Sequence, residues 1–136
     1  SRVRRGYITL SVSTFVPKPF TPFQWHPMER LSQVKEKLSL IKKGLTGEKG
    51  VRVVHDVPKY AHLQGLFSMG DRRVGRAIEE IAAGGFGSLK ASVRSVDPEE
   101  YIFRQKTLDE DLPWDFIDAG VTKEQLWSEY RKAVTD

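Results

Sequence analysis

A proline-rich segment between a strand-like run and a helix-like run constrains the fold of this chain more than any other feature. Residues 7–16 alternate apolar side chains with small hydroxyl side chains and are rich in β-branched residues, which predicts a strand. The segment that follows contains Pro17, Pro19, Pro22 and Pro27. Each proline fixes its own φ and biases the residue before it towards extended geometry. The sequence therefore predicts a stiff loop at the C-terminal end of a strand, where α/β proteins usually build their sites.

The predicted strand has two different faces. Ile8, Leu10 and Val12 share one face, and small hydroxyl side chains occupy the other. Inside a barrel these hydroxyls would leave room for a ligand, whereas in an edge strand they would face water. The pattern fits both arrangements equally.

The rest of the chain reads as helices with one further strand. Apolar residues recur at intervals of three and four from Met28 to Ile41, which predicts a buried stripe on a long helix. Asp71 is a predicted helix cap, and Thr122 with Gln125 fits the capping-box pattern before the last helix. We expect helices over about 27–45, 60–69, 72–83, 98–106 and 122–134, a strand over 51–56, and a helix stop at the glycines of 84–87.

The composition is that of an ordinary soluble domain. With 136 residues, 39% of them hydrophobic and 29% charged, the chain fits one domain or the tail of a larger one. No apolar run approaches the roughly 18 residues that a membrane span needs, and the basic start at 1–6 is not followed by a signal-peptide core. We therefore expect a cytoplasmic protein with no membrane partner. The net charge of +4 is spread among acidic residues and gives nucleic-acid binding only weak support.

Few residues carry an obvious chemical role. The chain contains no cysteine, which excludes disulfides, thiolate catalysis and cysteine-ligated clusters within it. His26, His55 and His62 match no metal-binding spacing, and His55 beside Asp56 fits a hydrogen-bonded structural histidine better than an acid–base catalyst. No catalytic residue is predicted. Lys18 lies between two prolines, so its ammonium would project from a rigid loop, either towards a carboxylate or phosphate or into water.

Three blocks of the sequence resemble one branch of the radical S-adenosylmethionine (radical SAM) enzymes, a branch that often carries an N-terminal cobalamin-binding domain. The blocks are VSTFVPKPFTPFQW at 12–25, LFSMGDRRVGRAIEE at 66–80 and LDEDLPWDFIDAGVTKEQLWSEY at 108–130. Their order and separations also agree with that branch, so the resemblance covers nearly the whole chain. In these enzymes a partial (β/α) barrel holds a four-iron (4Fe–4S) cluster through a CxxxCxxC loop near the first strand. The cluster cleaves S-adenosylmethionine to a deoxyadenosyl radical.

The resemblance implies a helix-dominant α/β fold, the C-terminal piece of a partial barrel followed by a helical extension. Residues 1–50 would supply the last barrel strand, the loop at the barrel mouth and a helix. Residues 51–136 would form the α/β and helical extension, and the whole would be one compact unit. The residues that this resemblance makes candidates for contacting the cosubstrate or substrate are Thr14, Phe15, Lys18 and Thr21.

Because the chain has no cysteine, the resemblance also implies a piece that is inert alone and binds no cofactor itself. The parent enzyme would hold the 4Fe–4S cluster and S-adenosylmethionine, with cobalamin as an optional addition. The partner of this chain would be the remainder of that parent. Ser1 starts without a methionine close to a strand, as a piece cut from a longer chain would. Such a piece would expose the apolar edge of its first strand and self-associate.

A second interpretation needs no parent enzyme. An autonomous module would bind nucleic acid or a partner protein through the basic start and the aromatic loop. A CxxxCxxC loop upstream in the same reading frame would favour the enzyme piece over the module.

Overall fold

The computed structural model describes residues 6–84 and 96–135, and this part of the chain is helix-rich with a small parallel sheet. It therefore belongs to the mixed α/β class that the sequence predicts, while a partial barrel is not seen in it. The elements in chain order are β1 (Ile8–Val12), the 3-10 helix η1 (Pro22–Trp25), α1 (Leu31–Gly44), β2 (Val51–His55), α2 (Pro58–Met69), α3 (Val74–Gly84), the π-helical turn η3 (Glu99–Phe103) and α5 (Lys123–Val134).

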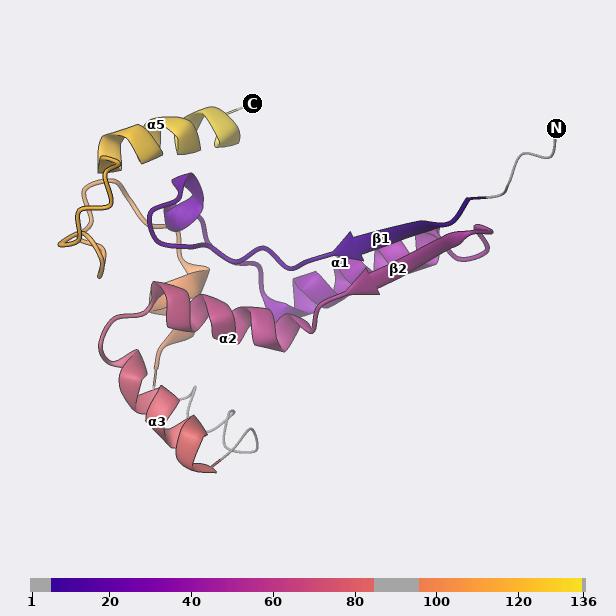
Figure 1. Cartoon of the computed structure of the whole chain (residues 1–136), viewed down its shortest axis with the longest axis horizontal. Helices are drawn as coiled ribbons and strands as arrows, with labels where there is room; N and C mark the ends of the chain where they lie inside the picture. Colours follow the sequence, from indigo (N-terminus) through magenta and orange to yellow (C-terminus); the bar gives the residue numbers. More distant parts are fainter. Residues whose placement is uncertain (1–5, 85–95, 136) are drawn as a thin grey trace.

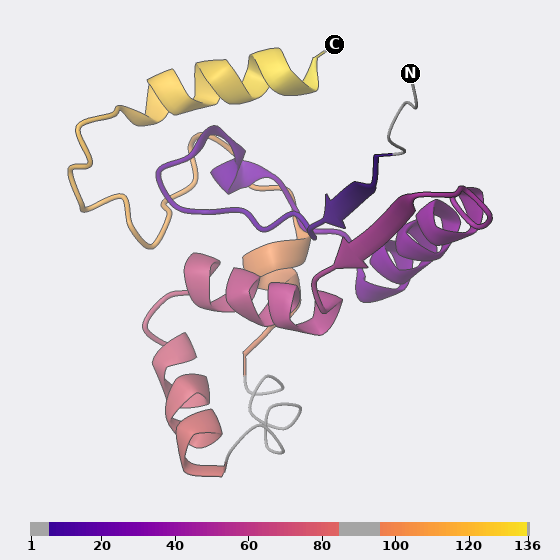
Figure 2. The same ribbon diagram turned by 45° about the vertical axis from the view of Figure 1, so that its right-hand side comes forward.

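The two strands and α1 form a projecting arm. β1 and β2 pair in parallel, with Ile8 opposite Val51 and Val12 opposite His55, and α1 connects them and covers one face of the pair (Figure 1). The remaining elements form a body at the C-terminal end of the strands, and the start of β1 lies towards the far tip of the arm (Figures 1 and 2). The chain is therefore a βαβ unit standing on a helical base.

Helix α1 confirms the predicted apolar stripe but begins later than the pattern suggests. Val34 and Leu38 are buried, as predicted. Residues before Leu31 stay extended because the backbone N–H of Met28 donates to the carbonyl of Ile102 in η3, at 2.6 Å, and the Met28 side chain is buried in the body. A tertiary contact thus replaces the first helical turn.

The capping signals were more reliable than the helix lengths. Thr122 and Gln125 form the predicted capping box, in which each side chain accepts a hydrogen bond from the other residue's backbone N–H. Asp71 accepts the backbone N–H of Arg73 at 2.8 Å, and α3 begins at Val74. The predicted helix over 98–106 is only the turn η3, because the chain extends at Arg104 to bring later residues against the body. Most of the predicted stop at 84–87 lies outside the described residues.

The core of the body joins segments that are far apart in the sequence. Trp25, Leu66 and Ile102 are fully buried in it. The side-chain oxygen of Gln24 accepts the indole N–H of Trp114 at 2.8 Å, across 90 positions of the sequence. The core therefore depends on the proline-rich loop as much as on the helices.

The sheet is unusually exposed for a parallel one, since parallel strands are normally covered on both faces. Ile8 is 59% exposed and Leu10 is 38% exposed, although both lie on the apolar face. Thr9 and Ser11 on the opposite face are exposed as well, so β1 is an edge strand within the described part of the chain. The exposed apolar edge expected from the sequence is observed.

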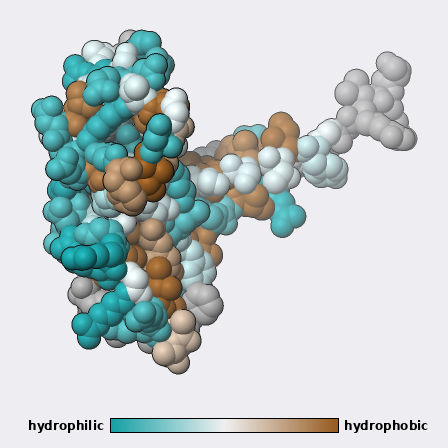
Figure 3. All heavy atoms as spheres, turned by 60° about the vertical axis from the view of Figure 1, so that its left-hand side comes forward, coloured by the Kyte–Doolittle hydropathy of each residue, from teal (hydrophilic) through white to brown (hydrophobic). Residues whose placement is uncertain are grey.

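The molecule has a large accessible surface for its mass. The chain exposes 9796 Å², about a third more than the roughly 7,200 Å² expected of a compact monomer of this mass. Figure 3 shows the arm standing away from the body with apolar side chains on its surface. Within residues 6–84 and 96–135, no helix combines the length and the apolar character required to traverse a lipid bilayer.

Candidate functional site

The loop that leaves β1 carries all four site residues predicted from the sequence, and Thr14 is the first of them. Its backbone N–H and its hydroxyl each donate to the Asp56 carboxylate, at 3.0 Å in both cases. Asp56 directly follows β2, so this pair ties together the C-terminal ends of the two parallel strands. Both groups of Thr14 are engaged, and its evident role in this structure is to hold the strand ends in register.

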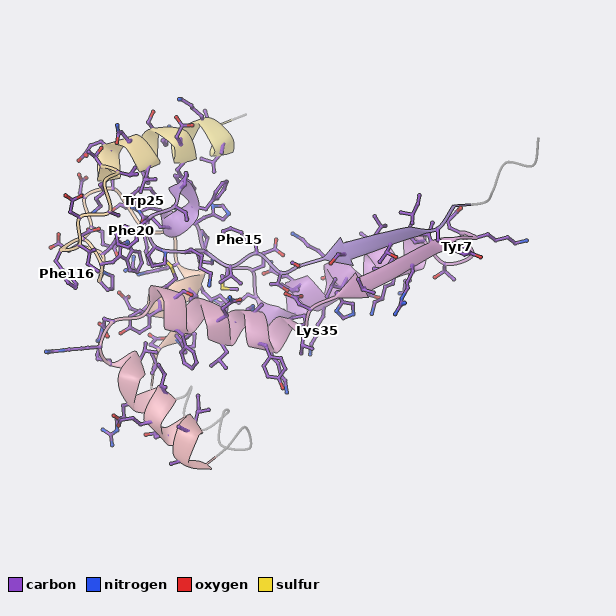
Figure 4. The ribbon with its side chains drawn as sticks, in the orientation of Figure 1. Tyr7, Phe15, Phe20, Trp25, Lys35 and Phe116 are labelled. Carbon is purple, nitrogen blue, oxygen red and sulfur yellow. The ribbon has the colours of Figure 1, made fainter. Side chains whose placement is uncertain are left out.

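Phe15 is 44% exposed and lies where the arm meets the body (Figure 4). Its ring makes edge-to-face contacts with the rings of Phe23 and His26, with centroids 5.8 Å away in both cases. The hydroxyl of Tyr130 donates to the side-chain oxygen of Gln105 at 3.2 Å, so it accepts from Nδ1 of His26 at 3.1 Å. The aromatic cluster of Phe15, Phe23, His26 and Tyr130 thus joins the loop to α5.

Lys18 is not free in solvent. Its half-buried ammonium donates to the hydroxyl of Ser68 in α2 at 2.7 Å. The hydroxyl of Thr21 donates to the Lys18 carbonyl at 2.8 Å and closes the turn between them. Lys18 therefore clamps the loop against α2, and Thr21 shapes the loop from within.

The same loop contains a strained residue. Phe20 has a φ of 58°, in the left-handed region that a bulky side chain rarely adopts. The side-chain oxygen of Gln24 accepts the Phe20 backbone N–H at 3.0 Å and holds this conformation. Prolines and hydrogen bonds together hold the loop in one defined conformation, in line with the stiff loop that the prolines predict.

Thr14 and Phe15 line a common pocket, and Lys18 and Thr21 do not. The pocket has a volume of about 190 Å³ and lies between the end of β1 and the flank of α1. Its wall is mostly apolar, with the ion-paired side chains of Glu29 and Lys37 at its rim. Ligand sites usually have roughly 300–1,000 Å³, so this pocket fits an apolar side chain better than a cosubstrate. The further lining residues are Val12, Ser13, Val34, Leu38 and Ile41.

The histidines are hydrogen-bonded at separate places. The Nδ1 atom of His55 lies 2.6 Å from the Asp56 carbonyl oxygen. Because a carbonyl can only accept, Nδ1 donates to it, and Nε2 accepts from the Lys42 ammonium at 2.7 Å. His62 contacts the Glu29 carbonyl through Nε2 at 2.8 Å, and burial lowers the pKa of its ring. Among the residues that the structure describes, no group of three His, Cys, Asp or Glu side chains could hold a metal ion.

Lys106 is a buried cation that the sequence pattern does not reveal. It is only 3% exposed, and its ammonium donates to the Tyr101 carbonyl at 2.6 Å. Burial, followed by the positive charge of Arg104, lowers its pKa to about 8. A lysine after a short helix normally faces water, and its burial here follows from the bond between its backbone N–H and the Trp25 carbonyl, at 3.1 Å.

Comparison with known proteins finds no match for this chain. No model of a protein family matches the chain, and no curated protein or solved structure matches it significantly. The family stays a prediction. What the residues offer chemically is a rigid loop, a partly exposed aromatic cluster and an apolar pocket at the C-terminal end of a parallel strand pair.

Proposed function

We propose that this chain is the C-terminal part of a radical SAM enzyme, to which it contributes barrel wall and mouth rather than the reacting cofactors. The main observation behind the proposal is that the outer edge of β1 in the arm is not covered by another described element. A parallel strand pair joined by a helix is the repeating unit of (β/α) barrels, and it is stable in such folds because neighbouring units cover it. Here Ile8 and Leu10 stand exposed at the edge of the pair.

The direction of the strands supports the same proposal. β1 and β2 both run towards the loop that carries Thr14, Phe15 and Lys18. In (β/α) barrels the loops at the C-terminal ends of the strands form the mouth. The uncovered face of the pair, with Thr9 and Ser11, would then line the barrel interior, where small hydroxyls leave space for a substrate.

The chain does not fit the cluster that such enzymes use. Iron–sulfur clusters are held by cysteine thiolates, and the sequence contains none. In this proposal the 4Fe–4S cluster and S-adenosylmethionine are held by the remainder of the parent protein, and no step of the reaction passes through a ligand from this chain. Its own residues shape the mouth: Lys18 and Thr21 fix the loop, and Phe15 stays partly exposed beside the pocket.

The deciding experiment starts from the complete reading frame that contains this sequence. We expect a CxxxCxxC motif upstream of residue 1. The complete protein, reconstituted anaerobically with iron and sulfide, should show cluster absorbance and form 5′-deoxyadenosine from S-adenosylmethionine. The 136-residue chain alone, treated identically, is the control and should do neither. A reading frame without the cysteines, or a stable cluster on the isolated chain, would overturn the proposal.

A further inference from the structure

The two sides of the arm differ in charge. On the β1 side, no residue from Gly6 to Pro17 carries a charged side chain. The β2 side carries Arg52 and the contact between His55 and Lys42. Edge strands of monomeric proteins are commonly protected from pairing by charges or prolines. The outer edge of β1 lacks this protection over its whole length.

The free backbone groups of this edge can be assigned. The N–H of Ile8 donates to the Gly50 carbonyl, and the Val12 carbonyl accepts from Asp56, so alternate residues starting at Ile8 bond to β2. The backbone groups of Thr9 and Ser11 therefore point outward. Figures 1 and 2 show no other described element beside them.

The flank of α1 above this edge carries one exposed leucine. Lys42 reaches β2, whereas Lys37 lines the pocket with the end of β1, so these residues mark opposite flanks of the helix. Leu40 lies about 60° around the helix from Lys37, on the β1 flank and away from the core. It is 71% exposed. Since Val12 shares the pocket with Leu38 and Ile41, Leu40 stands level with the C-terminal half of β1.

We propose that a second copy of this chain covers the β1 side of the arm. The two β1 strands pair antiparallel about a two-fold axis perpendicular to the sheet, near Leu10 and Ser11. The result is a four-stranded sheet in the order β2–β1–β1–β2. Both α1 helices then lie antiparallel on the same face, with their Leu40 side chains in contact across the axis.

The dimensions of regular structure favour this arrangement. Strands in a sheet lie about 4.8 Å apart, and each α1 covers one strand pair. The two helix axes are then about 10 Å apart, which is the distance at which helices pack. The uncharged edge lets identical strands approach without like-charge repulsion. The contact would cover Leu40, which is 71% exposed in the monomer.

This dimer is a property of the 136-residue chain and does not rest on the proposed function. In a parent enzyme the same edge would pair with a strand of its own polypeptide. A failure of the dimer would leave the reading-frame and deoxyadenosine experiments unaffected, and the reverse also holds.

Analytical ultracentrifugation over a range from micromolar to near-millimolar concentration tests the dimer. We expect a monomer–dimer equilibrium. Ser11→Pro removes an outward N–H while leaving the bonds to β2, and Leu40→Lys puts a charge on the axis. Each should weaken dimerisation by roughly tenfold or more, as truncation at an interface hot spot does. Ile78→Lys, at an exposed apolar residue of α3 in the body, is the matched control and should leave the equilibrium unchanged.

The absence of cysteine allows a direct check of geometry. Leu40→Cys should form a disulfide-linked dimer on mild oxidation, and Ile78→Cys should not. Circular dichroism confirms that each variant keeps its fold. A strict monomer at all concentrations overturns the proposal. A dimer that survives both Ser11→Pro and Leu40→Lys does so too, because it would use another surface.

Discussion

At the scale of single residues, Lys18 shows how a local reading and a tertiary contact differ. Its flanking prolines predict a projecting ammonium, and the structure directs that ammonium onto Ser68 in α2. A hydrogen bond of this kind contributes about 1 kcal/mol. Lys18 therefore has a measurable structural role, whether or not it also contacts a ligand.

The two roles of Lys18 can be separated by variants of both partners. Lys18→Ala and Ser68→Ala should each lower the free energy of unfolding by about 1 kcal/mol, and the double variant by little more, because both remove one bond. Urea denaturation measures this. In the complete enzyme of our proposal, Lys18→Ala should lower the turnover rate more than Ser68→Ala does. Equal turnover in the two variants would reduce Lys18 to a loop clamp.

Lys106 gives the protein a predictable response to pH. Its pKa is about 8 in the folded chain, against an ordinary value of 10.5. Between these values the unfolded chain holds a proton that the folded chain has released, so the free energy of unfolding rises with pH. Below pH 8 both states are protonated and the folded state bears the full cost of burying the charge.

We therefore expect the free energy of unfolding to rise between pH 8 and 10.5 by up to about 1.4 kcal/mol per pH unit from this group. Lys106→Met should remove that part of the slope, which denaturation at a series of pH values measures. Lys132→Met, at an exposed position of α5, should leave the slope unchanged. An unaltered slope in Lys106→Met would show that the buried amine does not titrate in this range.

At the scale of elements, the sequence predicts which helices and strands exist, and how helices are capped, better than it predicts where they begin and end. The stripe of α1 and the capping box of α5 are local patterns, and both are confirmed. The ends move where a distant partner competes for the backbone. Met28 pairs with Ile102 instead of starting α1, and Lys106 pairs with Trp25 instead of extending η3. No local pattern contains these partners.

Helix α1 offers a matched pair of leucines. Leu38→Ala removes a buried side chain and should lower the free energy of unfolding by roughly 2–5 kcal/mol, because it leaves a cavity against the sheet. Leu40→Ala, at an exposed position two residues away, should change it by less than about 0.5 kcal/mol in the dilute monomer. Thermal or urea unfolding at low protein concentration compares them. Similar losses in both variants would mean that α1 packs differently.

At the scale of the whole molecule, the sequence predicts the fold class and the candidate site residues, but not which of these residues lie together in the fold. Thr14 and Phe15 share a pocket, while Lys18 and Thr21 are used elsewhere in the loop. The loop itself is local and readable from its prolines. Where each side chain points depends on Asp56, Ser68 and the aromatic rings of η1 and α5, which only the assembled fold brings near.

The connection of the proline-rich loop to the last helix has a consequence for biosynthesis. The pairing of β1 with β2 lies within residues 8–56, so the strand pair can form as soon as that stretch has left the ribosome. The body must wait, because Gln24 meets Trp114 and His26 meets Tyr130 near the end of the chain. Trp25 therefore remains uncovered during most of translation. A nascent chain that stalls before Tyr130 would present this tryptophan to chaperones and proteases, whereas the completed chain conceals it.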